Sequence, residues 1–225
     1  MFTHVINNPN KFVIKDDYFV IPFGHRCTSA LVCKYANIRK FSLPFDWNST
    51  SFPGKIQKVL ENNFDDFIPD VHSGIFRNKY DFTLEHFNPN IDVGVEEYKR
   101  RIDRFNNIIN KGKKIYFVYF NEDYLWDSNY REDEFNNRMF NEMLELEKFL
   151  KNKYMGIDYN ILYFNFKHNK IPKTSNIINI ILHSTILDNY SLCNMSALRQ
   201  YSGEILAKMF NTNVNFDFDN NIFIN

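Results

Sequence analysis

The chain has few cysteines, no excess of either charge and no long apolar run. Its three cysteines, Cys27, Cys33 and Cys193, are too few for a disulfide framework and lack the spacing of metal ligands. Lys+Arg and Asp+Glu both number 27, which argues against binding nucleic acid through a broad basic face. The apolar runs fall short of the ~20 residues that a membrane helix needs. Residues 1–9 also lack the apolar core of a signal peptide. We therefore expect a cytoplasmic protein that neither enters a membrane nor uses a metal or other cofactor.

Glycine is also scarce, with 7 residues, whereas aromatic residues reach 17% and include 24 Phe and 13 Tyr. Phe, Tyr, Asn, Ile and Lys are encoded by AT-rich codons, so the composition suggests an AT-rich genome such as that of a large virus or a parasite. For a viral protein the expected location is the host cytoplasm. The hydrophobic share of 44% excludes a fully disordered chain. Phe is expected to fill core positions that Leu, Val and Ala usually fill.

Strand and helix patterns alternate along the chain without a repeat or a linker, so we expect one domain over residues 1–225. Runs of β-forming residues predict strands at 18–23, 114–120, 159–166 and 177–182. Apolar residues at helical spacing predict helices at 27–36, 55–63, 95–109, 134–153 and 196–210. This order predicts an α/β fold, a three-layer sandwich with a mostly parallel or mixed central sheet.

Several shorter segments have weaker patterns. Residues 41–47 are expected to be extended although Pro44 interrupts them, and residues 74–87 are expected to form a hairpin. Ser51 and Ser196 are candidate N-caps for the second and last helices. The tail alternates like an edge strand, with apolar residues at Val214, Phe216 and Phe218.

The stretch FGHRCTSA at residues 23–30 carries the clearest chemical signal. A strand ends, Gly24 allows a sharp turn and Cys27 begins a helix. Unpaired N–H groups at a helix N-terminus stabilise a thiolate and can receive an oxyanion. The alternative is a free cysteine packed under the sheet. Cys33 is expected to face the core, and Cys193 lies in a polar turn with no partner pattern.

Several motifs follow this junction in order. They are Gly24-x-x-Cys27, Pro-Phe-Asp-Trp at 44–47, His86-Phe87, Lys-Arg-Arg-Ile-Asp-Arg-Phe at 99–105 and a hydrophobic strand at 115–120. Together they resemble the signature of the putative papain-like cysteine peptidase family over residues 18–121. The resemblance also implies an alternative architecture, the papain-like α+β fold.

The resemblance implies a catalytic pair of Cys27 and His86, with His86 as the base. Without the resemblance, a partly buried histidine that hydrogen-bonds to the backbone is the favoured interpretation of His86. Asp46 is either a third catalytic member that orients the imidazole or a turn residue that accepts backbone N–H groups. His25 competes with His86 because it adjoins Cys27, and Trp47 either walls a pocket or belongs to the core.

Candidate substrate-binding residues are Gly24, His25, Trp47, Arg101 and Arg104. With Arg100, the two arginines form a basic cluster, in which positions 100 and 104 share a helix face, as do 101 and 104, and this cluster could clamp a phosphate or a carboxylate. Alternatively, they belong to a solvated face, since Glu96 and Glu97 precede Arg100 and Arg101 by four residues.

These residues predict a cysteine-dependent hydrolase or acyl-transfer enzyme with a peptide, other amide or glycan substrate. The alternative is a non-peptidase α/β protein that binds or modifies glycans or sugar nucleotides. The acidic, aromatic loop at residues 121–134 would then cover the pocket, and Cys27 would be a small pocket residue. A third, weaker interpretation is an interaction protein with a degenerate site.

Overall fold

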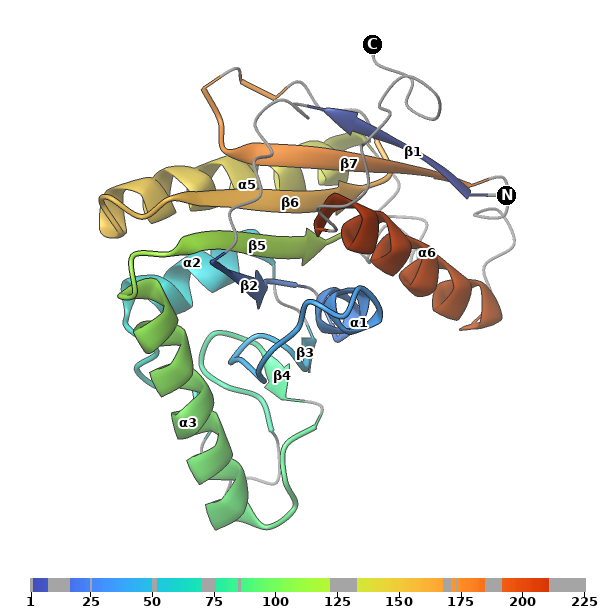
Figure 1. The fold of residues 1–225 in the computed structure, drawn as a ribbon. Helices are drawn as coiled ribbons and strands as arrows, with labels where there is room; N and C mark the ends of the chain where they lie inside the picture. Colours follow the sequence, from blue (N-terminus) through green and yellow to red (C-terminus); the bar gives the residue numbers. More distant parts are fainter. Residues whose placement is uncertain are drawn as a thin grey trace.

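A computed structural model describes residues 2–7, 17–24, 26–49, 52–69, 76–84, 86–121, 133–167, 171–172, 174–184 and 192–210 (Figure 1). The strand expected around Val214, Phe216 and Phe218 lies outside these ranges, as does most of the acidic loop at 121–134. In the described part of the chain, no helix is long and apolar enough to cross a membrane.

A five-stranded mixed sheet forms the centre of the molecule. Its strand order is β1 (Phe2–Asn7), β7 (Ile177–Ser184), β6 (Tyr159–Asn165), β5 (Lys114–Phe120) and β2 (Tyr18–Pro22). The four strands from β7 to β2 are parallel to one another, and β1 runs antiparallel to β7. All residues of β5 and β6 are buried. Their continuous β-forming sequence is typical of strands that are covered on both faces.

Helices cover both faces of this sheet (Figure 1). One face packs against α2 (Pro53–Glu61), α3 (Ile91–Ile109) and α5 (Asp133–Lys153), and the other packs against α1 (Thr28–Tyr35) and α6 (Leu192–Phe210). Side chains alternate between the two cores, so that Ile21 and Phe117 face the first, and Val20 and Val118 face the second. The structure therefore confirms the α/β three-layer sandwich, the first of the two architectures that the sequence left open.

A second, two-stranded sheet lies between α1 and α3, formed by β3 (Asn48–Ser49) and β4 (Thr83–Leu84). The hairpin expected at 74–87 is present in its described centre, where Arg77 bridges Thr83 and the Asn78 N–H donates to the Phe82 carbonyl at 2.9 Å.

The prediction of an extended segment at 41–47 is wrong, because residues 44–47 form a turn. Pro44 has no N–H for a strand ladder. The Asp46 N–H donates to the Leu43 carbonyl at 3.3 Å, and the Asp46 carboxylate accepts the Leu43 N–H at 3.0 Å. These two bonds close the turn.

Helix starts differ from the expected ones. The N-cap of α2 is Phe52, so the cap expected at Ser51 is wrong, and Pro53 occupies the first turn. Helix α6 begins at Leu192, which places Ser196 inside the helix instead of at its cap. Helix α3 begins at Ile91, before the start predicted at residue 95. Asn90 is its N-cap, because the Asn90 side chain accepts the Val93 N–H at 3.3 Å.

Candidate functional site

The strand–helix junction after β2 places Cys27 at the N-cap of α1 (Figure 1). Ser29, in the first turn of α1, lies between the carboxyl ends of β2 and β5. Its hydroxyl donates to the Phe23 carbonyl at 3.3 Å and accepts the Phe120 N–H at 3.0 Å. A Cβ on Gly24 would lie 1.9 Å from the Ser29 Oγ, so only glycine allows this close approach. Gly24 and Ser29 thus fix the start of α1 at the edge of the sheet.

The described neighbours of Cys27 include the start of a helix and a guanidinium from α6. Cys27 is half-buried, and its carbonyl accepts the first helical N–H, from Leu31, at 2.9 Å. The first turn of α1 has no acidic residue, so nothing there opposes the positive end of the helix. From α6, Arg199 Nε donates to the Thr28 Oγ1 at 2.8 Å. The residue before Cys27, Arg26, has a φ of 59°, a backbone strain that is often found at functional sites.

Asparagines stand at the ends of the next two strands, β5 and β6, at the same edge of the sheet. Asn121 comes directly after β5, is buried, and donates its N–H to the Phe164 carbonyl at 2.9 Å. Its side-chain amide donates to the Asn165 Oδ1, at the end of β6, at 3.3 Å. Burial raises the pKa of the neighbouring Tyr163 hydroxyl, and the Asn121 side chain opposes this effect. Neither asparagine was predicted from the sequence as a site residue, although each stands at or near the end of a predicted strand.

His86 lies beside Trp47, in the turn that follows β4. The His86 side chain is exposed, and its ring meets Trp47 edge-on, with 5.3 Å between the ring centroids. The Arg39 guanidinium lies 5.3 Å from the centre of the same Trp47 ring. Among the described residues the His86 side chain makes no hydrogen bond, so its imidazole is bonded to neither Cys27 nor Asp46.

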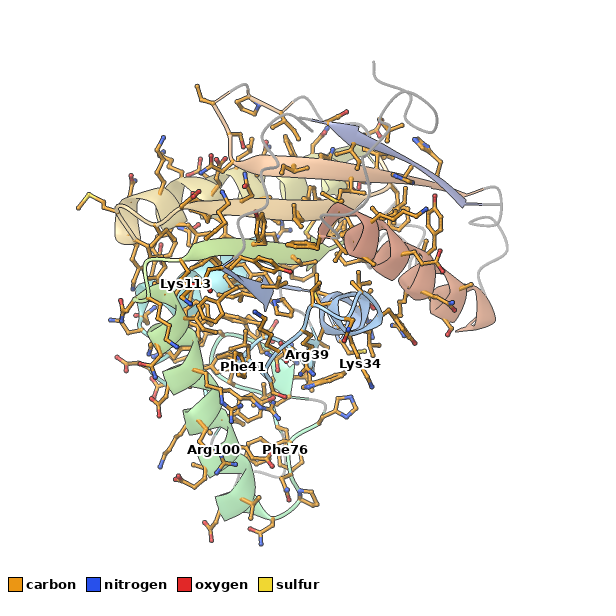
Figure 2. All side chains as sticks on the ribbon, viewed as in Figure 1. Lys34, Arg39, Phe41, Phe76, Arg100 and Lys113 are labelled. Carbon is orange, nitrogen blue, oxygen red and sulfur yellow. The ribbon has the colours of Figure 1, made fainter. Side chains whose placement is uncertain are left out.

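Asp46 is fully buried and forms an ion pair with Arg39, whose side chain is labelled in Figure 2. Its Oδ2 accepts a hydrogen bond from Arg39 Nε at 3.1 Å and another from the Leu43 N–H. The Leu43 bond is the one expected if Asp46 is a turn residue that accepts backbone N–H groups. Burial raises the pKa of Asp46, while Arg39 and the Leu43 N–H act against that rise. The Asp46 side chain therefore anchors both the turn and the guanidinium that packs on Trp47.

The two candidate arginines of α3 differ in their surroundings. Arg101 is nearly buried, its guanidinium lies 4.6 Å from the Tyr98 ring centroid, and it reaches Glu97 at 3.7 Å. This Glu97 contact is the helix ion pair expected from their spacing. Arg104 is exposed and donates to the Ser42 carbonyl at 3.3 Å. Arg104 is therefore the more accessible of the two to a ligand.

The other candidates are settled in part. Cys33 is fully buried, as expected, and burial raises its pKa, so this thiol is a poor nucleophile. His25 and the side chain of Cys193 lie outside the described residues. Within the described ranges, no three His, Cys, Asp or Glu side chains gather closely enough to hold a metal ion.

Comparisons with known proteins give one finding. No curated protein and no solved structure matches the chain significantly. A family model described as "putative papain-like cysteine peptidase" matches residues 18–72, which include Cys27 and Asp46 but end before His86 and the arginines of α3. Over these residues the chain is therefore similar to the putative papain-like cysteine peptidase family, the family that its sequence resembles.

Proposed function

We propose that this protein is a cysteine-dependent hydrolase or acyl-transfer enzyme with Cys27 as its nucleophile and His86 as its base. The observation that carries the proposal is the position of Cys27, half-buried at the N-cap of α1 and at the carboxyl edge of the parallel strands. Ligand sites of open α/β sheets lie at this edge. The family match over residues 18–72 supports the same residue.

The junction favours the thiolate form of Cys27. The start of α1 carries partial positive charge, and Arg199 places a guanidinium on the adjacent Thr28. Such surroundings lower a cysteine pKa from its usual value of about 8.5 toward neutrality. Cys33 is the internal contrast, because its pKa is raised in the core.

The proposed reaction is acyl transfer through a thioester. The Cys27 sulfur attacks the substrate carbonyl, and N–H groups at the start of α1 stabilise the resulting oxyanion. The imidazolium of His86 gives a proton to the leaving amine as the C–N bond breaks. His86 then takes a proton from water, or from an acceptor nucleophile, which attacks the thioester and releases the Cys27 thiolate.

His86 must approach Cys27 for this chemistry. The His86 ring is exposed and contacts the Trp47 ring, and it makes no hydrogen bond among the described residues, so a rearrangement of the side chain breaks none there. Catalytic hydrogen bonds are often formed only in the complex with substrate. In this proposal Asp46 acts indirectly, because it holds Arg39, and Arg39 packs on the Trp47 ring that positions His86.

The substrate in this proposal is a peptide or another amide. Gly24 and His25 would contact it beside Cys27, and Trp47 would flank it. Of the two α3 arginines, Arg104 is the one whose exposed guanidinium is accessible to a substrate carboxylate.

The first test measures the rate of Cys27 alkylation by iodoacetamide against pH, with peptide mass spectrometry to separate the cysteines. We expect a midpoint clearly below about 8.5 for Cys27, and no labelling of Cys33 in the folded protein. Arg199→Gln should raise the Cys27 midpoint. A Cys27 midpoint at or above the ordinary value, unchanged by Arg199→Gln, would contradict an activated thiol.

The second test uses a peptide vinyl sulfone, which forms a covalent bond with a catalytic thiolate. We expect labelling at Cys27 that His86→Ala slows by at least about a hundredfold, as loss of a general base does. His183→Ala, at an exposed position of β7, is the matched control and should leave the rate unchanged. Slow labelling that does not depend on His86 would instead favour a sugar-binding pocket in which Cys27 has no catalytic role.

A further inference from the structure

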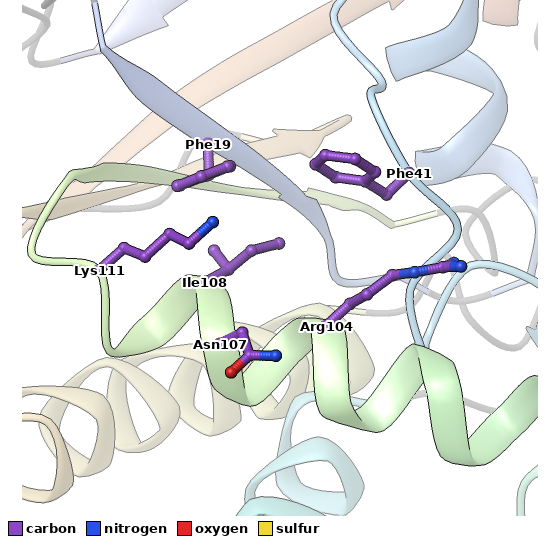
Figure 3. Close-up of a pocket in the computed structure, with 6 residues that line it drawn as sticks. All are labelled: Phe19, Phe41, Arg104, Asn107, Ile108 and Lys111. Carbon is purple, nitrogen blue, oxygen red and sulfur yellow. The ribbon is translucent and has the colours of Figure 1, made fainter.

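A cavity of about 220 Å³ lies between α3 and the edge strand β2 (Figure 3). Its lining residues are Phe19, Phe41, Arg104, Asn107, Ile108 and Lys111. Arg104, Asn107 and Ile108 come from α3 at the spacing i, i+3 and i+4, so they share one face of the helix. Lys111 follows in the turn just after the end of α3. This cavity stands beside the beginning of β2, whereas Cys27 follows its end.

The walls of the cavity are apolar. Phe19 and Ile108 belong to the core beneath it and are almost fully buried. Phe41, on the opposite side, is a large aromatic side chain that is 46% exposed (Figure 3). An apolar ligand between these side chains would remove the Phe41 ring from water, which is favourable in proportion to the area buried.

Cationic side chains stand around these apolar walls. Lys111 Nζ lies 5.5 Å from the centre of the Phe19 ring, and Lys113 Nζ lies 5.6 Å from the same centre. Lys113 forms an ion pair with Asp17 at 2.5 Å. Among the described residues, neither Lys111 nor Arg104 forms an ion pair with a carboxylate. Figure 3 shows the Lys111 ammonium turned inward, above Ile108 and toward Phe19.

The size and charge of the site define its ligand. An apolar cavity of about 150 Å³ is large enough for a benzene ring, so a cavity of about 220 Å³ accommodates a ring with a short chain. The Lys111 ammonium pairs with no carboxylate among the described residues, and an ammonium at an apolar wall is complementary to a carboxylate. We propose that this cavity binds a small aromatic carboxylate, with its ring between Phe19, Phe41 and Ile108 and its carboxylate on Lys111. The cavity shares Arg104 with the substrate contacts proposed above, but its binding of a carboxylate does not require the chemistry at Cys27.

The test is isothermal titration calorimetry of the full chain with 4-phenylbutyrate. The matched ligand is 4-phenyl-1-butanol, which keeps the apolar body but lacks the charge. We expect the carboxylate to bind at least about tenfold more tightly than the alcohol, because a hydrogen bond to a charged group is stronger than a neutral one. Equal affinities for the two ligands, or no binding of the carboxylate up to millimolar concentration, would overturn the proposal.

Three variants locate the binding site. Lys111→Gln should weaken carboxylate binding by about tenfold and leave alcohol binding unchanged. Asn107→Trp, at an exposed position of the lining, should fill the cavity and abolish the binding of both ligands. Lys208→Gln is the control, since it removes an exposed lysine from α6 on the other face of the sheet. The proposal fails if Lys111→Gln and Lys208→Gln have the same effect.

Discussion

At the scale of single residues, Gly24 and Ser29 decide how closely α1 approaches the sheet. The Ser29 hydroxyl joins the carboxyl ends of β2 and β5, where it replaces a backbone partner for the Phe120 N–H. An added Cβ at Gly24 would stand 1.9 Å from the Ser29 Oγ and 2.5 Å from its Cβ. The need for glycine is therefore steric and comes from one neighbouring side chain.

The substitution Gly24→Ala should lower the free energy of unfolding by about 2–3 kcal/mol, the cost of forcing an atom into a packed region and displacing a buried hydroxyl. Urea denaturation measures this change. Ser29→Gly is destabilising by itself, but it removes the clash. The double variant should therefore lose at least about 0.5 kcal/mol less than the sum of the two single variants. Strict additivity would show that Ser29 is not the residue that excludes alanine.

Only the part of the site that is formed by neighbouring residues in the sequence could be predicted. The position of Cys27 after a strand and before a helix depends on consecutive residues, and it was predicted from their pattern. Arg199 reaches Thr28 from a helix far along the chain, and no local pattern indicates that contact. Likewise, the packing of His86 on Trp47 depends on how the loops before and after α2 are folded.

At the scale of elements, the strands with continuous β-forming sequence were predicted and the irregular ones were not. β5 and β6 match their expected ranges to within one residue, because burial on both faces demands an unbroken apolar run. β1 was missed, since this six-residue strand includes the polar residues His4 and Asn7 and pairs with β7 from the far end of the chain. The prediction of an extended segment at 41–47 was wrong, because the side-chain hydrogen bonds of Asp46 outweigh the preference of the segment's β-forming residues for a strand.

The contact between α1 and α6 gives a prediction in which two effects have opposite signs. Gly203 lies inside α6, where alanine has a helix propensity better by about 1 kcal/mol. A Cβ there would lie 2.5 Å from the Tyr35 Cβ and 3.2 Å from the Val32 carbonyl oxygen, both in α1. Neither atom is the end of a flexible side chain, so the helices would have to move apart.

We expect Gly203→Ala to be destabilising by a net ~1–2 kcal/mol, because the cost of overpacking exceeds the gain in propensity. Thermal denaturation followed by circular dichroism measures it. Gln200→Ala is the matched control on the exposed face of the same helix and should be neutral or slightly stabilising. A stabilised Gly203→Ala variant would mean that the two helices are packed less closely than described.

At the scale of the whole molecule, β1 completes the sheet and links it to the last helix. It runs antiparallel at the edge beside β7. His4 on β1 places its Nδ1 2.8 Å from the hydroxyl of Tyr201 in α6. Burial, together with the positive charge of Lys208, lowers the pKa of His4 below its usual value of 6.5. The first strand and the last helix therefore meet at a histidine that favours the neutral form.

This lowered pKa predicts that acid weakens the fold in a definite pH range. The unfolded chain takes up a proton on His4 near pH 6.5, whereas the folded chain does so only at lower pH. The unfolded state thus binds more protons in that range, and the free energy of unfolding falls as the pH is lowered from 6.5 through the folded pKa. Urea denaturation at pH 7.5 and 5.0 should show a larger loss of stability for the natural chain than for His4→Phe, whose ring does not titrate. Other groups titrate equally in both proteins and cancel in the comparison. An identical pH dependence in the two proteins would show that His4 contributes nothing to it, and that the contact with Tyr201 does not depend on a neutral imidazole.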